Sequence, residues 1–277
     1  MTTPWVDRDA DWTPDYAGLM RLDEQVHVIL GAGFGIGRQT AHALSAFGAT
    51  VVCVDREAER AEKVAAEAGG VAWTGDITDR ESVAALFDFV GERFGRLDGV
   101  VDIVGLARYK RLQDLSDDDW TYHLDLVVKH AYLAITYAAK FWERTGTGGS
   151  MAFVASVAGL ASSPNLSAYG AMKAALMSLI RTAAVEFGPL GVRVNAVAPG
   201  IIRTPRQQAN PRWTRELVEA NIEKTPLRKL AYPSDIASVL LFLVSPLAGH
   251  VTGESIVVDG GNHSLFNVDS PEPDRQA

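Results

Sequence analysis

VHVILGAGFGIG, the stretch at residues 26–37, decides the fold, because it joins an apolar β-strand to a glycine-rich turn. A helical sequence, RQTAHAL at residues 38–44, follows directly. Glycines let a backbone approach a pyrophosphate closely, and the free amides at the start of a helix attract its negative charge. With 25 Gly in 277 residues the glycines alone could form a purely structural turn, but the order strand, glycine turn, helix predicts a dinucleotide site. The expected contacts are Gly31, Gly33, Phe34, Gly35, Ile36 and Gly37.

Beyond this stretch, short apolar segments alternate with longer Ala- and Glu-rich segments of helical spacing, which is the pattern of repeated βαβ units. The apolar segments are nearly continuous, as strands must be when helices cover both faces of a parallel sheet. Strands are predicted at residues 26–30, 50–55, 71–74, 99–104, 150–155, 193–198 and 254–258. We therefore expect an α/β fold with a doubly wound, parallel seven-stranded sheet flanked by helices on both faces.

Nothing in the chain indicates a domain boundary, since it has no internal repeat and no low-complexity linker. A single nucleotide-binding domain over residues 1–277 is the expectation. Residues 1–20 and 264–277 are polar and contain prolines, which is typical of solvated tails. Residues 203–233 have little strand character and several prolines, so they are expected to leave the sheet as a loop that covers the substrate.

The composition of the chain indicates which classes of molecule it can bind. Hydrophobic residues make up 47% and charged residues 22%, as in a soluble globular protein, and the net charge of -8 disfavours nucleic acid and anionic membranes. The single cysteine, Cys53, excludes an internal disulfide and a cysteine metal cluster, and no histidine pair has metal-binding spacing. The start lacks the features of a secretory signal, and no apolar run is long enough to span a membrane. These observations favour a cytoplasmic protein that acts on a small molecule, without a metal.

The end of the second predicted strand bears on the choice of cofactor. Asp55 follows Gly37 by eighteen residues, near where a carboxylate would accept hydrogen bonds from the adenosine ribose and repel a 2'-phosphate. NAD is therefore favoured over NADP, although the neighbouring Arg56 would reach such a phosphate if the loop rotated, and Asp55 could simply end a strand. Asp76 and Ile77 follow the third strand and are expected near the adenine, with a helix-capping role for Asp76 as the alternative.

Tyr169 and Lys173 are the candidates for the chemistry. Residues four apart on a helix share a face, so both side chains can point into one cleft. A tyrosine hydroxyl titrates near 10, so forming its phenolate at neutral pH costs roughly 4 kcal/mol, and a nearby ammonium can offset much of that cost. Tyr169 is therefore predicted to exchange a proton with an alcohol or carbonyl substrate, with help from Lys173.

With Ser156, this pair resembles the active site of the short-chain dehydrogenase/reductase family, which places a serine thirteen residues before the tyrosine and a lysine four residues after it. The resemblance extends from Val26 to Gly261. It implies a Rossmann fold and hydride transfer between NAD and a secondary alcohol or ketone, with Ser156 holding the substrate oxygen and Lys173 the nicotinamide ribose. It further implies a homotetramer. The other expected cofactor-binding positions are Val104, Gly105, Pro199, Gly200, Ile202 and Thr204. The match also includes Asn195, Ile201, Arg203, residues 251–253 and residues 259–261.

The chain departs from the family at two places. Residues 102–105 are Asp-Ile-Val-Gly where the family has Asn-Asn-Ala-Gly, and Val127 replaces an asparagine that helps to connect the active-site lysine to solvent. His123 and His130 flank Val127 at helical spacing, so either could replace the asparagine, or both are ordinary helix-surface residues. These departures leave open a second function, that of a catalytically impaired sensor or scaffold which binds the nucleotide.

Substrate choice is expected to depend on residues 106–111, 159–166 and 203–233. Four arginines of the last segment suggest either an anion site or a solvated basic face: Arg203, Arg206, Arg212 and Arg215. Four apolar side chains suggest either a pocket for a hydrophobic substrate or core packing: Leu160, Pro164, Leu166 and Trp213. Apolar helix faces near residues 124–135 and 174–181 are consistent with a homo-oligomer.

Overall fold

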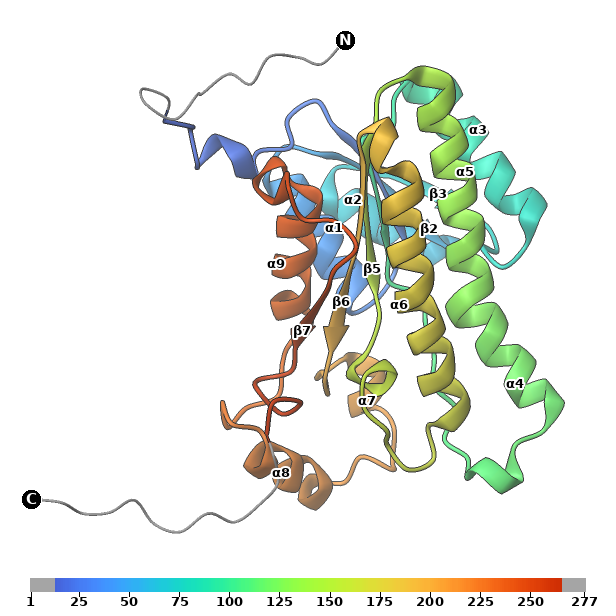
Figure 1. Ribbon diagram of the computed structural model, residues 1–277, viewed down its shortest axis with the longest axis vertical. Coiled ribbons are helices and arrows are strands. Elements are labelled where there is room, and N and C mark those ends of the chain that lie inside the picture. Colours follow the sequence, from blue (N-terminus) through green and yellow to red (C-terminus); the bar gives the residue numbers. More distant parts are fainter. Residues whose placement is uncertain (1–12, 266–277) are drawn as a thin grey trace, which may run out of the picture.

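The computed structural model describes residues 13–265, and they form one parallel sheet with helices on both faces (Figure 1). The predicted tail positions 1–12 and 266–277 lie outside this range. The strand order is β3-β2-β1-β4-β5-β6-β7, so the chain starts in the middle of the sheet and winds outward in both directions. The strands are β1 (Val26–Leu30), β2 (Thr50–Asp55), β3 (Val71–Thr74), β4 (Gly99–Asp102), β5 (Gly149–Val154), β6 (Val192–Pro199) and β7 (Ser255–Val258). The predicted fold class is confirmed.

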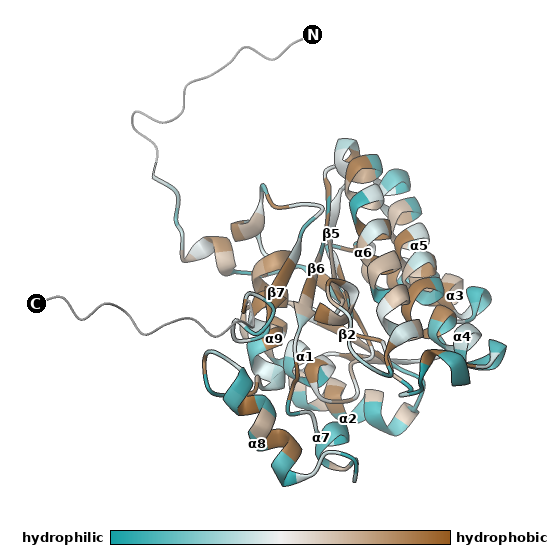
Figure 2. Ribbon diagram, turned by 60° about the horizontal axis from the view of Figure 1, so that its bottom comes forward, coloured by the Kyte–Doolittle hydropathy of each residue, from teal (hydrophilic) through white to brown (hydrophobic). Residues whose placement is uncertain are grey.

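Helices cover the two faces of the sheet as separate layers (Figure 1). One layer holds α3 (Arg80–Phe94), α5 (His130–Thr145) and α6 (Ser167–Phe187), which pack on one hydrophobic cluster. The other layer holds α1 (Ile36–Ala46), α2 (Ala58–Ala68) and α9 (Pro233–Val244), which pack on a second cluster. Because side chains alternate along a strand, Val28 and Leu30 enter the first cluster while Ile29 enters the second. Both faces of the strands are therefore apolar. In Figure 2 the strands are largely brown, the colour of hydrophobic residues.

Burial in these two clusters is the main source of stability. All five residues of β1 are buried, and Val28 and Ile29 have no exposed surface. Each fully buried aliphatic side chain of this size contributes about 1.5–3 kcal/mol relative to an exposed one. Buried β-branched residues also suit the strand conformation itself, so propensity and burial favour the same structure.

Two irregular segments shape the region beyond the carboxyl ends of the strands. Between α4 (Asp117–His123) and α5, residues Leu124–Lys129 form a π-helical turn, which widens the helix locally. After β6, residues 203–233 leave the sheet and form α7 (Pro205–Gln208) and α8 (Arg215–Lys224), which lie at the lower end of the molecule in Figure 1. Over the described residues 13–265, no helix has the length and apolarity to cross a membrane.

Candidate active site

A cleft of about 840 Å³ opens at the carboxyl ends of the parallel strands, where open α/β sheets bind their ligands. It is lined by residues from all seven strand ends or the loops that follow them, and by α6, α7 and α8. All but two of the predicted site residues line it, the exceptions being Gly33 and Gly37. Residues that line it without having been predicted include Arg60, Leu126 and His263, while Gln207, Asn210 and Lys229 line it from the predicted segment 203–233.

The glycine turn fits a pyrophosphate for reasons that the structure makes specific. Gly31 and Gly35 have φ angles of 82° and 54°, in the left-handed region that favours glycine. A Cβ atom on Gly37 would lie 2.0 Å from the carbonyl oxygen of Gly31, so only glycine allows α1 to start this close to the turn. Gly35 is the N-cap of α1, and no side chain of the described residues caps that end. The amides of Gly37 and Arg38 donate to the carbonyl of Phe34, so those of Gly35 and Ile36 are the ones available to an anion.

Phe34 lies at the mouth of this turn between two arginines. The guanidinium carbons of Arg60 and Arg206 lie 5.7 Å and 5.8 Å from the centre of its ring. Arg206 comes from α7 and Phe34 from the glycine turn, so this contact joins the segment over the cleft to the nucleotide end. Two cations beside the helix N-terminus make this part of the cleft suitable for a polyanionic ligand.

Asp55 is held at the end of β2 by two backbone amides. Its Oδ2 accepts a hydrogen bond from Gly33 at 3.2 Å, and its Oδ1 accepts one from Glu57 at 3.0 Å. A Cβ atom on Gly33 would approach Oδ2 to 2.5 Å, which explains the need for glycine there. Asp55 and the neighbouring Arg56 both line the cleft, so the carboxylate and the guanidinium that bear on the choice of cofactor lie side by side.

Asp76 does not cap the following helix, so that alternative is wrong. Its Oδ1 accepts hydrogen bonds from the backbone amide of Thr78 at 2.8 Å and from its hydroxyl at 2.7 Å. The N-cap of α3 is Asp79, whose carboxylate accepts from the amide of Ser82 at 2.8 Å. Asp76 and Ile77 instead line the nucleotide half of the cleft.

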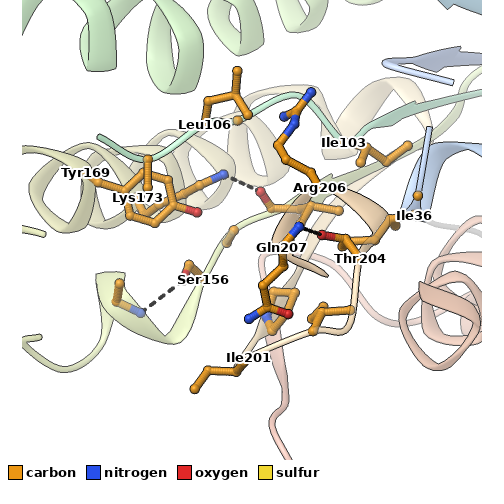
Figure 3. A pocket seen from close by; sticks show the side chains of 18 of the residues that line it. Ile36, Ile103, Leu106, Ser156, Tyr169, Lys173, Ile201, Thr204, Arg206 and Gln207 are labelled. Atoms are coloured by element: carbon orange, nitrogen blue, oxygen red, sulfur yellow. Dashed lines mark hydrogen bonds between the residues drawn. The ribbon is translucent and has the colours of Figure 1, made fainter. Parts of the chain in front are cut away.

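Ser156, Tyr169 and Lys173 meet at the other end of the cleft (Figure 3). Ser156 follows β5, and its Oγ accepts a hydrogen bond from the amide of Ala158 at 3.1 Å. Tyr169 and Lys173 lie in the first two turns of α6, and the Nζ of Lys173 is 5.6 Å from the centre of the tyrosine ring. Lys173 is only 1% exposed, and its Nζ donates to the carbonyl of Val154 at 2.6 Å.

Burial shifts the pKa values of Tyr169 and Lys173, and both shifts affect proton transfer. It raises the pKa of Tyr169 to about 12, and a hydrogen bond from Ser156 opposes this shift. It lowers the pKa of Lys173 to about 8, and the charge of Asp102 opposes this shift. At pH 7 the cofactor-free protein therefore holds a neutral tyrosine beside a largely cationic lysine, which is the protonation state needed to give a proton to a ketone oxygen.

His123 and His130 are not helix-surface residues, contrary to one of the two sequence interpretations. Both are buried, because the widened turn between α4 and α5 brings them under the cleft. His123 has one acceptor and one donor as partners: its Nδ1 donates to the carbonyl of Asp119 at 2.7 Å, and its Nε2 accepts from the amide of Arg108 at 3.0 Å. Its ring packs edge-on against Tyr169, with 6.2 Å between centroids.

Val127 is fully buried in the apolar cluster beneath α5 and does not line the cleft, whereas Leu126 does. His130 lies on the same buried side. Its Nε2 contacts the carboxylate of Asp102 at 3.1 Å, and its Nδ1 is 3.3 Å from the carbonyl of Asp125. The departure at Asp102 is therefore in contact with His130, which lies three residues after the departure at Val127.

The predicted substrate segments meet around the catalytic end, although not every predicted residue does. The backbone of Lys110 pairs with that of Asn165 and Leu166, and its Nζ forms an ion pair with Asp119 at 2.5 Å. This ion pair holds the pKa of the Asp119 carboxyl well below its usual range. Leu166 and Trp213 line the cleft, and Leu160 and Pro164 do not.

The four arginines do not form a common anion site. Among them only Arg206 lines the cleft. Arg203 donates to the hydroxyl of Tyr232 at 3.2 Å, and Arg215 forms an exposed ion pair with Glu219 at 2.7 Å. A basic face is the better description of the other three. Over the described residues 13–265, no group of three or more His, Cys, Asp or Glu side chains has the arrangement of a metal site.

Known proteins are similar to this chain over most of its length. A family model described as enoyl-(acyl carrier protein) reductase matches residues 31–263. Cis-4-hydroxycyclohexanecarboxylate dehydrogenase of Sinomonas cyclohexanicum is 38% identical over 86% of the chain and 96% of its own length. The 3-oxoacyl-[acyl-carrier-protein] reductase FabG of Thermotoga maritima is 32% identical over 87% of the chain and 99% of its own. A 7α-hydroxysteroid dehydrogenase complexed with NADH and 7-oxo glycochenodeoxycholic acid superimposes with a TM-score of 0.83 at 34% identity, covering 88% of the chain and 96% of that structure.

Proposed function

The chain belongs to the short-chain dehydrogenase/reductase family, and from this premise we propose that it is an NAD(H)-dependent oxidoreductase that interconverts a secondary alcohol and a ketone. Membership makes it an oxidoreductase that uses an NAD(P) cofactor. The single observation that supports the rest is the convergence of Ser156, Tyr169 and Lys173 at one end of a cleft whose other end has a pyrophosphate-sized glycine turn.

Tyr169 acts as the general acid and base. In reduction its neutral hydroxyl gives a proton to the ketone oxygen, and in oxidation its phenolate takes the proton of the alcohol. Lys173 stabilises the phenolate, because its ammonium lies 5.6 Å from the centre of the tyrosine ring in a site shielded from water. Ser156 holds the substrate oxygen in line with the tyrosine hydroxyl. When bound, the nicotinamide accepts or donates the hydride.

The remaining lining residues hold the dinucleotide. The amides at the start of α1 bind the pyrophosphate, with Thr204 beside them, and Lys173 binds the nicotinamide ribose. Asp55 accepts hydrogen bonds from the adenosine ribose, and its charge disfavours a 2'-phosphate. NAD is therefore the proposed cofactor. The remaining proposed contacts are Phe34, Arg56, Asp76, Ile77, Val104, Gly105, Pro199, Gly200 and Ile202.

The substrate pocket favours an apolar ketone with some polar groups. Leu106, Leu166 and Trp213 supply apolar walls, and Gln207 and Asn210 supply amides. Two of the proteins that the chain resembles are named for ring alcohols, a hydroxycyclohexanecarboxylate and a hydroxysteroid. We therefore expect cyclic secondary alcohols and ketones to be the first substrates turned over in a screen.

The test is a screen of cyclic and open-chain ketones that follows NADH absorbance, with NADPH in parallel and Tyr169→Phe as the control. We expect turnover with NADH and a loss of about 10³-fold in kcat for Tyr169→Phe, within the range for removing a general acid. Undiminished turnover in Tyr169→Phe would overturn the assigned role. Tight NADH binding without turnover of any compound would instead favour the sensor or scaffold function, and a preference for NADPH would overturn the role given to Asp55.

Assembly as a cytoplasmic homotetramer completes the proposal. Large apolar side chains stay exposed on the π-helical turn and on α5 and α6, notably Leu124, Tyr132 and Val185, which are 39%, 44% and 79% exposed. Contact between copies through this helix layer would cover them. Light scattering during gel filtration at several concentrations tests this, and a monomer of 29.8 kDa at every concentration would overturn it.

A further inference from the structure

Three ionisable side chains are buried together behind Tyr169, and the proposed reaction uses only one of them. Asp102 ends β4, His130 begins α5, and Lys173 lies in α6; they are 2%, 1% and 1% exposed. A buried charge is costly unless an opposite charge or several hydrogen bonds compensate for it. Among residues 13–265, the ammonium of Lys173 donates its hydrogen bond to a neutral carbonyl, that of Val154. A nearby negative charge is therefore needed.

The backbone places Asp102 where it can supply that charge. Asp102 pairs in register with Phe153 on the neighbouring strand, and Lys173 binds the carbonyl of the next residue, Val154. Neighbouring strands are about 4.8 Å apart. Val100 and Phe153 both belong to the cluster under α5 and α6, so Asp102, two residues after Val100, faces the same layer. The turn after Asp102 also reaches the ammonium: a Cβ atom on Gly105 would lie 2.9 Å from the Nζ of Lys173.

His130 holds the carboxylate from the other side. Its Nε2 lies 3.1 Å from Asp102, whose Oδ1 also accepts from the amide of Val104 at 3.0 Å. The Oδ2 of Asp102 is buried, lies 3.1 Å from the same Nε2 and makes no hydrogen bond of good geometry within residues 13–265, so the carboxylate has capacity left for a cation. The second ring nitrogen of His130 faces the carbonyl of Asp125, another acceptor, so the ring presents a proton to Asp102 when it is protonated at Nε2.

We propose that Asp102 is the buried counter-ion that keeps Lys173 cationic, and that His130 is the positioning residue that fixes this carboxylate. The assignment rests on the proposed function, in which the charge of Lys173 stabilises the phenolate of Tyr169. The negative charge of Asp102 also raises the pKa of Lys173 against the larger lowering effect of burial. The other ionisable groups nearby are Tyr169 on α6 and the surface ion pair between Asp125 and Lys129, 3.4 Å apart on the π-helical turn.

The direct test is a pH titration of Lys173 in the cofactor-free protein, followed by NMR of carbon-13-labelled lysine. Lys173→Met identifies the resonance by its disappearance. We expect a midpoint near the pKa of about 8 in the unaltered protein. Asp102→Asn keeps the shape and removes the charge, so the midpoint should fall by about one pH unit or more. An unchanged midpoint in Asp102→Asn would overturn the proposal.

Variants of His130 keep the proposal testable if Asp102→Asn does not fold. His130→Leu removes the hydrogen bond and leaves the carboxylate to Lys173 alone, so the lysine midpoint should rise. His130→Gln can still donate an N–H to Asp102, so its midpoint should stay near that of the unaltered protein. His27→Asn is the matched control, because His27 is equally buried, on β1, and its neighbours in the structure are Gln25, Asp98 and Arg96. If the titration midpoint of Lys173 is unchanged in His130→Leu, or shifts in His27→Asn, the role given to His130 is wrong.

Turnover gives an independent readout. In Asp102→Asn the alkaline limb of the kcat/KM profile for ketone reduction should move to lower pH by the same amount as the lysine midpoint. A purely structural role would instead lower the rate equally at every pH. The titration needs neither cofactor nor substrate, so a failure of the counter-ion role and a failure of the proposed function are seen in different experiments.

Discussion

His123 and His130 are seven residues apart, equally buried, and differ in what surrounds their rings. His123 lies between a carbonyl and a backbone amide, so a neutral ring with its proton on Nδ1 satisfies both partners. His130 lies between a carboxylate and a carbonyl, so a ring with its proton on Nε2 donates to Asp102. The first supports Tyr169 from the substrate side, and the second faces the lysine side. The widened turn between them therefore separates two sides of Tyr169. We call the substrate side, beside His123, the neutral front, and the lysine side, beside His130, the charged rear.

The largest expected effect is at the rear, in Lys173→Met. Methionine fills a similar volume without a charge, so the phenolate of Tyr169 loses its nearest cation and alcohol oxidation should fall about 100-fold in kcat, the equivalent of two pKa units. Stability should fall as well, because methionine leaves the buried carboxylate of Asp102 without its cation, and removing one partner of a buried ion pair costs about 3–5 kcal/mol. Measuring kcat well below the thermal midpoint of the variant separates the two effects. Full alcohol oxidation by the folded variant would contradict the role of the lysine.

The parts of the site differ also in how far the sequence alone predicts their positions. The cofactor end follows from local patterns: β1, the glycine turn and α1 are consecutive, and Asp55 ends the next strand. Ser156, Tyr169 and Lys173 follow from spacing, because the helix fixes the last two relative to each other. The strands were placed to within about two residues, since apolar runs ending in turns mark them clearly.

Contacts between distant segments could not be predicted in the same way. Asp102 and His130 are 28 residues apart, and nothing in either local sequence indicates that a π-helical turn will bring them together. Arg60 was missed because its position over Phe34 depends on how α2 packs beside the glycine turn. The sequence groups the arginines of residues 203–233 together, but only Arg206 lines the cleft, whereas Arg203 binds Tyr232 and Arg215 binds Glu219.

Asp55→Asn is expected to have the next largest effect and sharpens the comparison by leaving both histidines untouched. The amide keeps one acceptor oxygen and removes the charge that repels a 2'-phosphate, while Arg56 remains in the cleft. The ratio of kcat/KM for NADH over NADPH should fall about tenfold, or about 1.4 kcal/mol. The Lys173 midpoint should not change. An unaltered cofactor ratio would show that Asp55 acts only in the glycine turn, where it binds the amide of Gly33.

His27 provides a third buried histidine, remote from the cleft, whose effect is on stability alone. Burial lowers its pKa from 6.5 to about 4, and the charge of Asp98 opposes that shift only in part. The unfolded chain therefore binds the proton first as the pH falls, so this contribution is complete above pH 6.5 and is lost progressively down to about pH 4. Allowing for relaxation around the ring, the loss is about 1–2 kcal/mol. Urea unfolding of His27→Asn should show less dependence on pH between 6.5 and 4 than the parent.

The smallest expected effect compares front and rear directly, through His123→Leu and His130→Leu. Leucine at 123 leaves the amide of Arg108 without its acceptor and removes the ring that packs on Tyr169. The wall formed by residues 106–110 should loosen, so KM for the ketone should rise about fivefold, which is about 1 kcal/mol and in the range for the loss of one hydrogen bond. The pH profile should stay in place, since a neutral ring is replaced by a neutral side chain. His130→Leu should do the reverse, moving the pH profile and leaving KM within twofold. If both variants change KM alike, the two histidines serve one structural purpose, and the division into a neutral front and a charged rear is wrong.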